Sequence, residues 1–184
     1  IYMIGPVITT ILAFFILKEK ITLTQVIIVI VGLIGAIVIS KHNSNVFNYA
    51  IIFPFLAATC FAFFTIFTKF LNTSDSNQTT LLFTAVSGSV LSLPFIFFYW
   101  ETPNFYQLAL MFCLGSLATI GHFFFIEALK VINASFAAPF VYLTVLLAAF
   151  WGYFIYDEIP DDNTILGAFL IILAGIIITR IKTK

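Results

Sequence analysis

FYQLALMFCLGSLATIGHFFFIEAL, residues 105–129, contains only two side chains that can carry a charge near neutral pH, His122 and Glu127. An α-helix rises about 1.5 Å per residue, so a helix of this length exceeds the roughly 30 Å hydrocarbon core of a bilayer. Such a helix also satisfies its own backbone hydrogen bonds, which lipid cannot do. The stretch therefore predicts a membrane-spanning helix.

The whole chain has the same character. Its 184 residues are 62% hydrophobic and 9% charged, and the mean hydropathy is +1.15. A soluble domain has about 45–50% apolar and about 25% charged residues, so this chain has too few polar side chains to cover a water-facing surface. The formal net charge is zero, which leaves no basic field to attract nucleic acid. The composition predicts an integral membrane protein and excludes nucleic-acid binding.

Charged and turn residues divide the chain into seven apolar segments, each of which we expect to cross the membrane as a helix. The predicted spans are residues 1–17, 25–40, 48–71, 78–100, 105–129, 133–156 and 163–179. The connections are too short for a soluble domain, so the predicted fold class is an all-α integral membrane protein. The chain begins at Ile1, without Met and inside an apolar run, and we expect it to be N-terminally incomplete.

Polar residues that cap helix N-termini precede most of the predicted helices. Thr22 and Gln25 have the spacing of a capping box, in which each side chain bonds the backbone of the other residue. The remaining predicted caps are Asn48, Asn77, Asn104, Asn133 and Asp162 or Asn163.

Lysine and arginine are distributed unevenly between the two sides of the predicted membrane. One side receives Lys18, Lys20, Lys69, Lys130, Arg180, Lys182 and Lys184. The other side receives only Lys41. Because short cytoplasmic loops are enriched in basic residues, this split predicts a multi-pass protein of the inner membrane with its C-terminus in the cytoplasm.

Two pairs of helices share one plan. In each pair a proline-containing helix ends at an acidic loop, and the following helix carries a glycine. Glu19 precedes Gly35 by 16 residues in the first pair, and Glu158 precedes Gly175 by 17 residues in the second. The charge distribution places Glu19 inside and Glu158 outside. Two like units of opposite orientation form an inverted repeat, which is a common plan of secondary transporters.

The offset between the two pairs is five helices, so each repeat has five. Residues 1–40 are then the last two helices of the first repeat, residues 41–47 are the loop between the repeats, and residues 48–184 are a complete second repeat with a short basic tail.

Several short motifs follow one another in a distinctive order. They are Pro6 with Lys18-Glu19-Lys20-Ile21-Thr22, Glu127-Ala128-Leu129, Ala137-Ala138-Pro139, Asp157-Glu158-Ile159-Pro160, and Gly167-Ala168 with Gly175. In this order the chain resembles the EamA-type carriers of the drug/metabolite transporter superfamily. The resemblance covers helices four to ten of a ten-helix member and implies a 5+5 inverted-repeat fold, of which three N-terminal helices are absent here.

The resemblance implies transport of a small organic metabolite by alternating access, with no enzymatic activity, no cofactor and no metal site. S-adenosylmethionine, an amino acid and a vitamin-like solute are the candidate substrates. The first of these fits the frequent Ile, Phe, Asn and Lys, which are typical of the AT-rich genomes of host-dependent bacteria. The alternatives are a seven-helix receptor or sensor and a non-functional truncated carrier fragment. The expected partners are the lipid bilayer and the solute, and a homodimer is left open.

The resemblance further implies a central cavity lined by the predicted helices 1–17, 48–71, 105–129 and 133–156. Polar side chains in these helices are the candidate cavity residues: Thr10, Thr59, Thr119, His122, Ser135 and Tyr142. His122 is ionisable inside a span, which suggests solute contact or proton coupling, or else a neutral imidazole bonded to another helix. Tyr142 offers an aromatic hydroxyl, although packing between helices explains it equally well.

Pro6, Pro139 and Glu127 are candidates for kink or gate positions. Each proline removes a backbone donor, which either bends the helix toward a cavity or leaves a static kink. Glu127 lies three residues before Lys130, so it is either a gate residue or half of an interfacial ion pair.

Overall fold

A computed structural model describes residues 2–39, 52–72, 76–157 and 159–180, and every regular element in them is helical. The predicted cap Asn48 and the predicted loop residue Glu158 lie outside the described residues. The chain divides into two compact units, which are described separately. The first comprises Ile1–Phe67 and Ile132–Lys184, and the second comprises Thr68–Val131.

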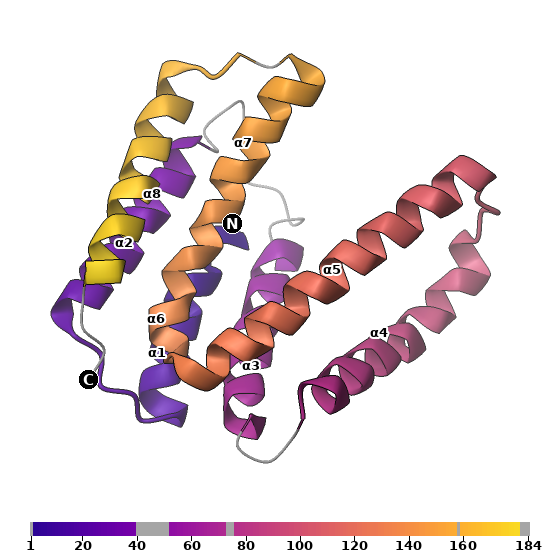
Figure 1. Ribbon diagram of the computed structural model, residues 1–184, viewed down its shortest axis with the longest axis horizontal. Helices are drawn as coiled ribbons and strands as arrows, with labels where there is room; N and C mark the ends of the chain where they lie inside the picture. The colour runs from indigo at the N-terminus through magenta and orange to yellow at the C-terminus, as the bar shows by residue number, and fades with distance from the viewer. Residues whose placement is uncertain (1, 40–51, 73–75, 158, 181–184) are drawn as a thin grey trace. The chain divides into compact units, whose positions relative to one another are not determined.

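The first unit contains helices from both ends of the chain, and the second contains the helices between them. The elements of the first unit are η1 (Tyr2–Ile4), α1 (Gly5–Ile16), α2 (Leu23–Ile39), most of α3 (Ile52–Leu71), α6 (Ala134–Ala137), η3 (Ala138–Tyr142), α7 (Leu143–Tyr156) and α8 (Asp162–Arg180). The second unit holds the end of α3, α4 (Asn77–Tyr99) and α5 (Phe105–Val131). Figure 1 follows this order along the chain.

Within the described residues, each of the seven predicted spans contains a helix. Five are long and apolar enough to cross a membrane, and the segment Ala134–Tyr156 is one of them. The two at the N-terminal end, Tyr2–Ile16 and Leu23–Ile39, are apolar but shorter. The prediction of an all-helical, multi-pass membrane protein is confirmed.

The two prolines predicted to bend helices have different surroundings. Pro139 lies in η3, a five-residue 3₁₀ segment that separates α6 from α7, so the predicted interruption is present. Pro6 instead lies in the first turn of α1, directly after η1. The N–H that a proline lacks at this position has no partner within an α-helix, so no helical hydrogen bond is lost there, and a kink or gate role of Pro6 stays a prediction.

In the first unit, α2 and α8 lie side by side (Figure 1). A Cβ atom on Gly35 would lie 2.8 Å from the carbonyl oxygen of Gly167, and one on Gly167 would lie 2.5 Å from the carbonyl oxygen of Gly35. The two backbones therefore touch, as small residues allow in membrane helices. Toward one end of this contact, Ile28 is buried in a cluster with Ala174 and Ile178.

The helix α1 packs along α6 and η3, and its start also meets α3. The rings of Tyr2 and Phe61 have centroids 6.3 Å apart, and a Cβ on Gly5 would lie 3.8 Å from Ala58. The broken helix of residues 134–142 is therefore covered by the first helix of the chain.

The second unit is a hairpin of α4 and α5, and its helices bury few side chains. On α5, Ile126 and Leu129 are buried, and both lie near the C-terminal end. Polar bonds hold that end. Lys69 Nζ donates to the carbonyl oxygen of Leu129 at 2.6 Å, Asn72 Nδ2 donates to that of Ile126 at 3.0 Å, and Asn77 donates to the Glu127 carboxylate.

Within the described residues, four helices begin with a side-chain cap from a nearby residue. The predicted capping box is confirmed, because the Thr22 N–H donates to Gln25 Oε1 at 2.8 Å and the Gln25 N–H donates to Thr22 Oγ1 at 3.3 Å. Asn104 also caps its helix as predicted. Ser76 caps α4, one residue before the predicted Asn77, and Asp161 caps α8, directly before the two predicted alternatives Asp162 and Asn163. Asn133 occupies the predicted N-cap position of α6, but its side chain makes no cap bond.

Candidate functional site

Glu19 lies in a tight turn that ends the first helix. The backbone N–H groups of Leu17 and Glu19 both donate to the carbonyl oxygen of Ala13, each at 3.2 Å. Lys18, between them, has φ +55°, a left-handed conformation that is uncommon for a residue other than glycine. Both features fix where the Glu19 side chain starts.

The Glu19 carboxylate caps the start of the broken helix. The N–H of Ala134 donates to Oε1 at 2.8 Å, the N–H of Ser135 donates to Oε2 at 3.0 Å, and the Ser135 hydroxyl also donates to Oε2. Ala134 and Ser135 have no exposed surface. Glu19 thus replaces the missing Asn133 cap from more than a hundred residues away and places a negative charge at the positive end of a helix.

The 3₁₀ segment that follows places Tyr142 in the core of the first unit. The ring lies against Gly32, where an added Cβ would come within 2.4 Å of it. Ala36 and Ile171 complete a buried cluster around the ring. The Tyr142 hydroxyl is buried and has no hydrogen-bond partner among the described residues. An unpaired buried hydroxyl is costly, so it is a natural contact for a solute or a water molecule.

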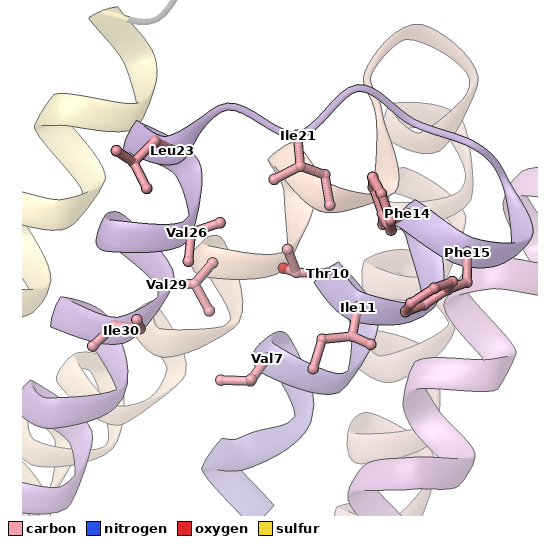
Figure 2. Close-up of a pocket in the computed structure, with 10 residues that line it drawn as sticks. All are labelled: Val7, Thr10, Ile11, Phe14, Phe15, Ile21, Leu23, Val26, Val29 and Ile30. Atoms are coloured by element: carbon pink, nitrogen blue, oxygen red, sulfur yellow. The ribbon is translucent and has the colours of Figure 1, made fainter.

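Thr10 lines a pocket between α1, α2 and the loop that joins them (Figure 2). The pocket has a volume of about 490 Å³, and its other lining residues are apolar: Val7, Ile11, Phe14, Phe15, Ile21, Leu23, Val26, Val29 and Ile30. The Thr10 hydroxyl donates to the carbonyl oxygen of Pro6 at 2.8 Å. Because no charged group lines this pocket, it does not suit a charged metabolite.

The candidate threonines all bond back to their own helices. Thr59 donates to the carbonyl oxygen of Phe55 at 2.9 Å, and Thr119 donates to that of Gly115 at 2.8 Å. Such bonds occupy the hydroxyl proton and leave the oxygen as an acceptor. His122 follows the same pattern, with Nδ1 3.3 Å from the carbonyl oxygen of Ala118. Its ring is exposed, as is Thr119.

Glu127 forms an ion pair with Lys130, which the sequence analysis gave as the alternative to a gate role. Its carboxylate lies 3.2 Å from Lys130 Nζ and also accepts a hydrogen bond from Asn77. The bond from Asn77 joins the end of α5 to the start of α4.

The candidate residues fall into two groups. Pro6, Thr10, Ser135, Pro139 and Tyr142 lie on α1, α6 and η3 in the first unit, and Thr59 lies on α3 of the same unit. Thr119, His122 and Glu127 lie on α5 in the second unit. A cavity that unites the two groups stays a prediction.

Sequence reasoning missed what Glu19 and Lys69 do. From the sequence, Glu19 was placed in the acidic loop of the first repeat, and Lys69 among the basic residues of one side of the membrane. In the structure each side chain bonds an end of a distant helix. For Glu19 the available signal was that the first turn of α6 has no acidic residue of its own.

The helices and their apolar surfaces define a class of protein, a multi-pass membrane protein built of α-helices. Within that class, residues 48–180 match the EamA-like transporter family. The chain belongs to this family.

Three relatives illustrate the similarity. The S-adenosylmethionine uptake transporters of Rickettsia prowazekii and Rickettsia felis are each 38% identical to this chain over 179 residues, which are 97% of the chain and 61% of each relative. The riboflavin transporter of Vibrio cholerae is 27% identical over 183 residues, which are 99% of the chain and 61% of that relative. The chain therefore spans about three fifths of the length of these relatives. No solved structure gives a significant match.

Proposed function

We propose that this chain forms the core of a carrier that moves a small organic metabolite across the inner membrane by alternating access. In this proposal residues 1–40 belong to one repeat and residues 48–184 form the other, inverted repeat. The observation that carries the proposal is the packing of α2 against α8, because those helices would be equivalent members of the two repeats.

The sequence supplies a numerical offset between the repeats. Glu19 and Glu158 are 139 residues apart. The same offset relates Ile28 to Gly167, Gly35 to Ala174, which is the residue before Gly175, and Ile39 to Ile178.

The observed contacts of α2 with α8 come in exchanged pairs under this offset. The close approach of Gly35 to Gly167 corresponds to Ala174 and Ile28, that of Ile39 to Gly167 corresponds to Ile178 and Ile28, and Ile28, Ala174 and Ile178 lie in one buried cluster. When two copies of one unit meet across a two-fold axis, every contact of residue i with residue j is matched by a contact of j with i. The exchanged pairs therefore support two helices of common origin that meet across a pseudo-two-fold axis.

The proposed substrate is S-adenosylmethionine, taken up into the cell. Its support is the similarity to the two Rickettsia uptake transporters over nearly the whole chain. Riboflavin is the second candidate because of the Vibrio relative. The basic residues on one predicted side support a cytoplasmic C-terminus. A carrier makes and breaks no covalent bond, so no catalytic residue is proposed.

Tyr142 is the residue that we propose first as a solute contact. Its hydroxyl lacks a partner in the described chain, whereas the hydroxyls of Thr10, Thr59, Thr119 and Ser135 all donate within the protein. We retain those four residues and His122 as lining residues of the proposed cavity, with Pro6, Pro139 and Glu127 as the kink and gate candidates.

The test measures uptake of radiolabelled S-adenosylmethionine, and separately of riboflavin, by bacterial cells that do not otherwise import them. Tyr142→Phe is compared with Tyr153→Phe, which changes a half-exposed tyrosine of α7. We expect Tyr142→Phe to reduce uptake about three- to tenfold, the equivalent of one hydrogen bond, while the melting temperature stays equal or rises because an unpaired hydroxyl is removed.

Three results would count against parts of this proposal. Uptake of neither solute by the wild-type protein would contradict the proposed substrates. Normal uptake by the Tyr142→Phe variant would remove Tyr142 from the solute site. An equal loss in the Tyr153→Phe variant would mean that the effect is not specific to the buried hydroxyl.

A further inference from the structure

Glu19 provides a helix cap of a different kind from the other caps described above. Ser76, Asn104 and Asp161 each cap the helix that follows them, from a position three residues before the amide that they bind. Glu19 caps a helix that starts 115 residues later in the chain. A local cap stabilises one helix, whereas a remote cap also ties two segments together.

The helix that Glu19 caps depends on the cap more than a regular helix does. Only α6, four residues long, precedes the 3₁₀ segment that contains Pro139. Pro139 has no N–H, so it cannot donate to the carbonyl oxygen of Ser135 four residues earlier. A short helical turn with a missing internal bond is weak by itself. The three bonds to the Glu19 carboxylate therefore hold the start of this helix.

We propose that Glu19 is a positioning residue that closes one face of the transport path. This inference rests on the proposed function, in which residues 1–40 and 48–184 belong to opposite repeats. The bonds from Ala134 and Ser135 to Glu19 then run from one repeat to the other at a single face of the protein. In alternating access the repeats separate at one face at a time, so these bonds break whenever this face opens.

The chemistry of the contact suits a gate. Ala134 and Ser135 are fully buried and Glu19 is half-buried, so water is largely kept from the bonds while they are closed. When the bonds open, the carboxylate and the two amides are exposed together and water can satisfy all of them.

The experiment compares Glu19→Gln with Thr22→Ala in the intact protein. Glutamine keeps the size of the side chain but removes the charge and replaces one acceptor oxygen by an NH₂ donor that faces an amide donor. Thr22→Ala is the matched control, because it removes the Thr22 hydroxyl and its two bonds to Gln25, three residues from Glu19, and leaves the remote cap intact. Ser135→Ala is the intermediate variant, since it removes the hydroxyl bond and keeps both amide bonds.

Two readouts separate a gate from a merely structural bond. The first is the concentration dependence of solute uptake. The second is labelling of an Ala134→Cys variant by a membrane-impermeant maleimide, in a background where the exposed cysteines Cys60 and Cys113 are replaced by serine. The Ala134 backbone N–H remains available to Glu19 in that variant. Labelling is measured in sealed vesicles of each orientation.

We expect Glu19→Gln to lower the maximal uptake rate at least tenfold, with a change in KM of less than about threefold. We also expect it to raise the labelling of position 134 at least fivefold, from one side of the membrane only. Ser135→Ala gives a smaller change in the same direction, and Thr22→Ala leaves both quantities within about twofold.

The outcomes distinguish this inference from the proposed function. Unchanged labelling and unchanged uptake in the Glu19→Gln variant overturn the gate. Equal losses of uptake and of membrane-inserted protein in the Glu19→Gln and Thr22→Ala variants also overturn it, because they show a structural role only. If the wild-type protein transports neither solute, the proposed function fails, while the labelling experiment still decides whether Glu19 closes this face.

Discussion

The two units of the chain hold their helices together in different ways. In the first unit, α2 and α8 meet through Gly35 and Gly167 so closely that neither position has room for a Cβ atom. In the second unit, the positions of Gly88, Gly115 and Gly121 have no neighbouring atom within 4 Å of an added Cβ. There the described contacts between helices concentrate at one end, in the hydrogen bonds of Lys69, Asn72 and Asn77.

The lipid bilayer explains why helices need one of these two kinds of contact. Lipid chains are as apolar as leucine side chains, so burying an apolar helix face against another helix gains little free energy in a bilayer. Helices must associate either by close packing of small residues or by polar bonds. The first unit uses close packing along α2 and α8, and the second uses polar bonds at the ends of its helices. The open faces of α4 and α5 are available to lipid or to other helices.

The largest effect is expected from adding a methyl group to the tight packing. Gly35→Ala and Gly167→Ala would each place a Cβ within 2.8 Å of a backbone oxygen, so α2 and α8 must move apart. Overpacking of this kind costs about 1–3 kcal/mol or more, and we expect the melting temperature of the purified protein to fall by about 4–10 °C.

Gly88→Ala is the matched control for this prediction. The same substitution on α4 meets no neighbouring atom, and alanine is the better helix former by about 0.5–1 kcal/mol, so the melting temperature should stay equal or rise. If Gly88→Ala destabilised the protein as much as Gly35→Ala, the contrast between the two units would be wrong.

The polar end of the second unit gives the next largest effect. Lys69→Met keeps most of the apolar stem of the side chain and removes the charged donor to the Leu129 carbonyl oxygen. A hydrogen bond from a charged group contributes about 1.5–3 kcal/mol, so we expect the melting temperature to fall by several degrees.

Lys130→Met tests whether any lost lysine would have the same effect. Lys130 pairs with Glu127 at the surface, where an ion pair contributes little. We therefore expect a smaller change than for Lys69→Met. Equal changes in the two variants would mean that charge near the helix end, and not the bond to the carbonyl oxygen, stabilises the hairpin.

These features differ in how far the sequence predicts them. The helices follow from apolar runs of membrane length, and the Thr22–Gln25 and Asn104–Gln107 caps follow from partners that are three residues apart. The caps from Glu19 and Lys69 were not predicted, because their partners lie 115 and 60 residues away and no local pattern connects them.

The candidate site was predicted less well for a similar reason. Helical periodicity assigns Thr59 and Thr119 to a face, but it does not reveal that their hydroxyl protons bond within their own helices. The unpaired hydroxyl of Tyr142 depends on Gly32, Ala36 and Ile171, which come from distant parts of the chain. Only the three-dimensional structure separates Tyr142 from the other candidates.

The smallest effect concerns the turn that positions Glu19. Lys18 has φ +55°, which strains a residue with a Cβ by about 1–2 kcal/mol, whereas glycine adopts it freely. Glycine also raises the entropy of the unfolded chain at a cost of about 0.5–1 kcal/mol. The net expectation for Lys18→Gly is stabilisation of about 0.5 kcal/mol. Lys20→Gly is the control in the same loop, because it loses the same charge without relieving any strain. We therefore expect the melting temperature of Lys20→Gly to fall below that of the wild type, and that of Lys18→Gly to rise slightly. The opposite order would show that the left-handed conformation of Lys18 does not destabilise the turn that positions Glu19.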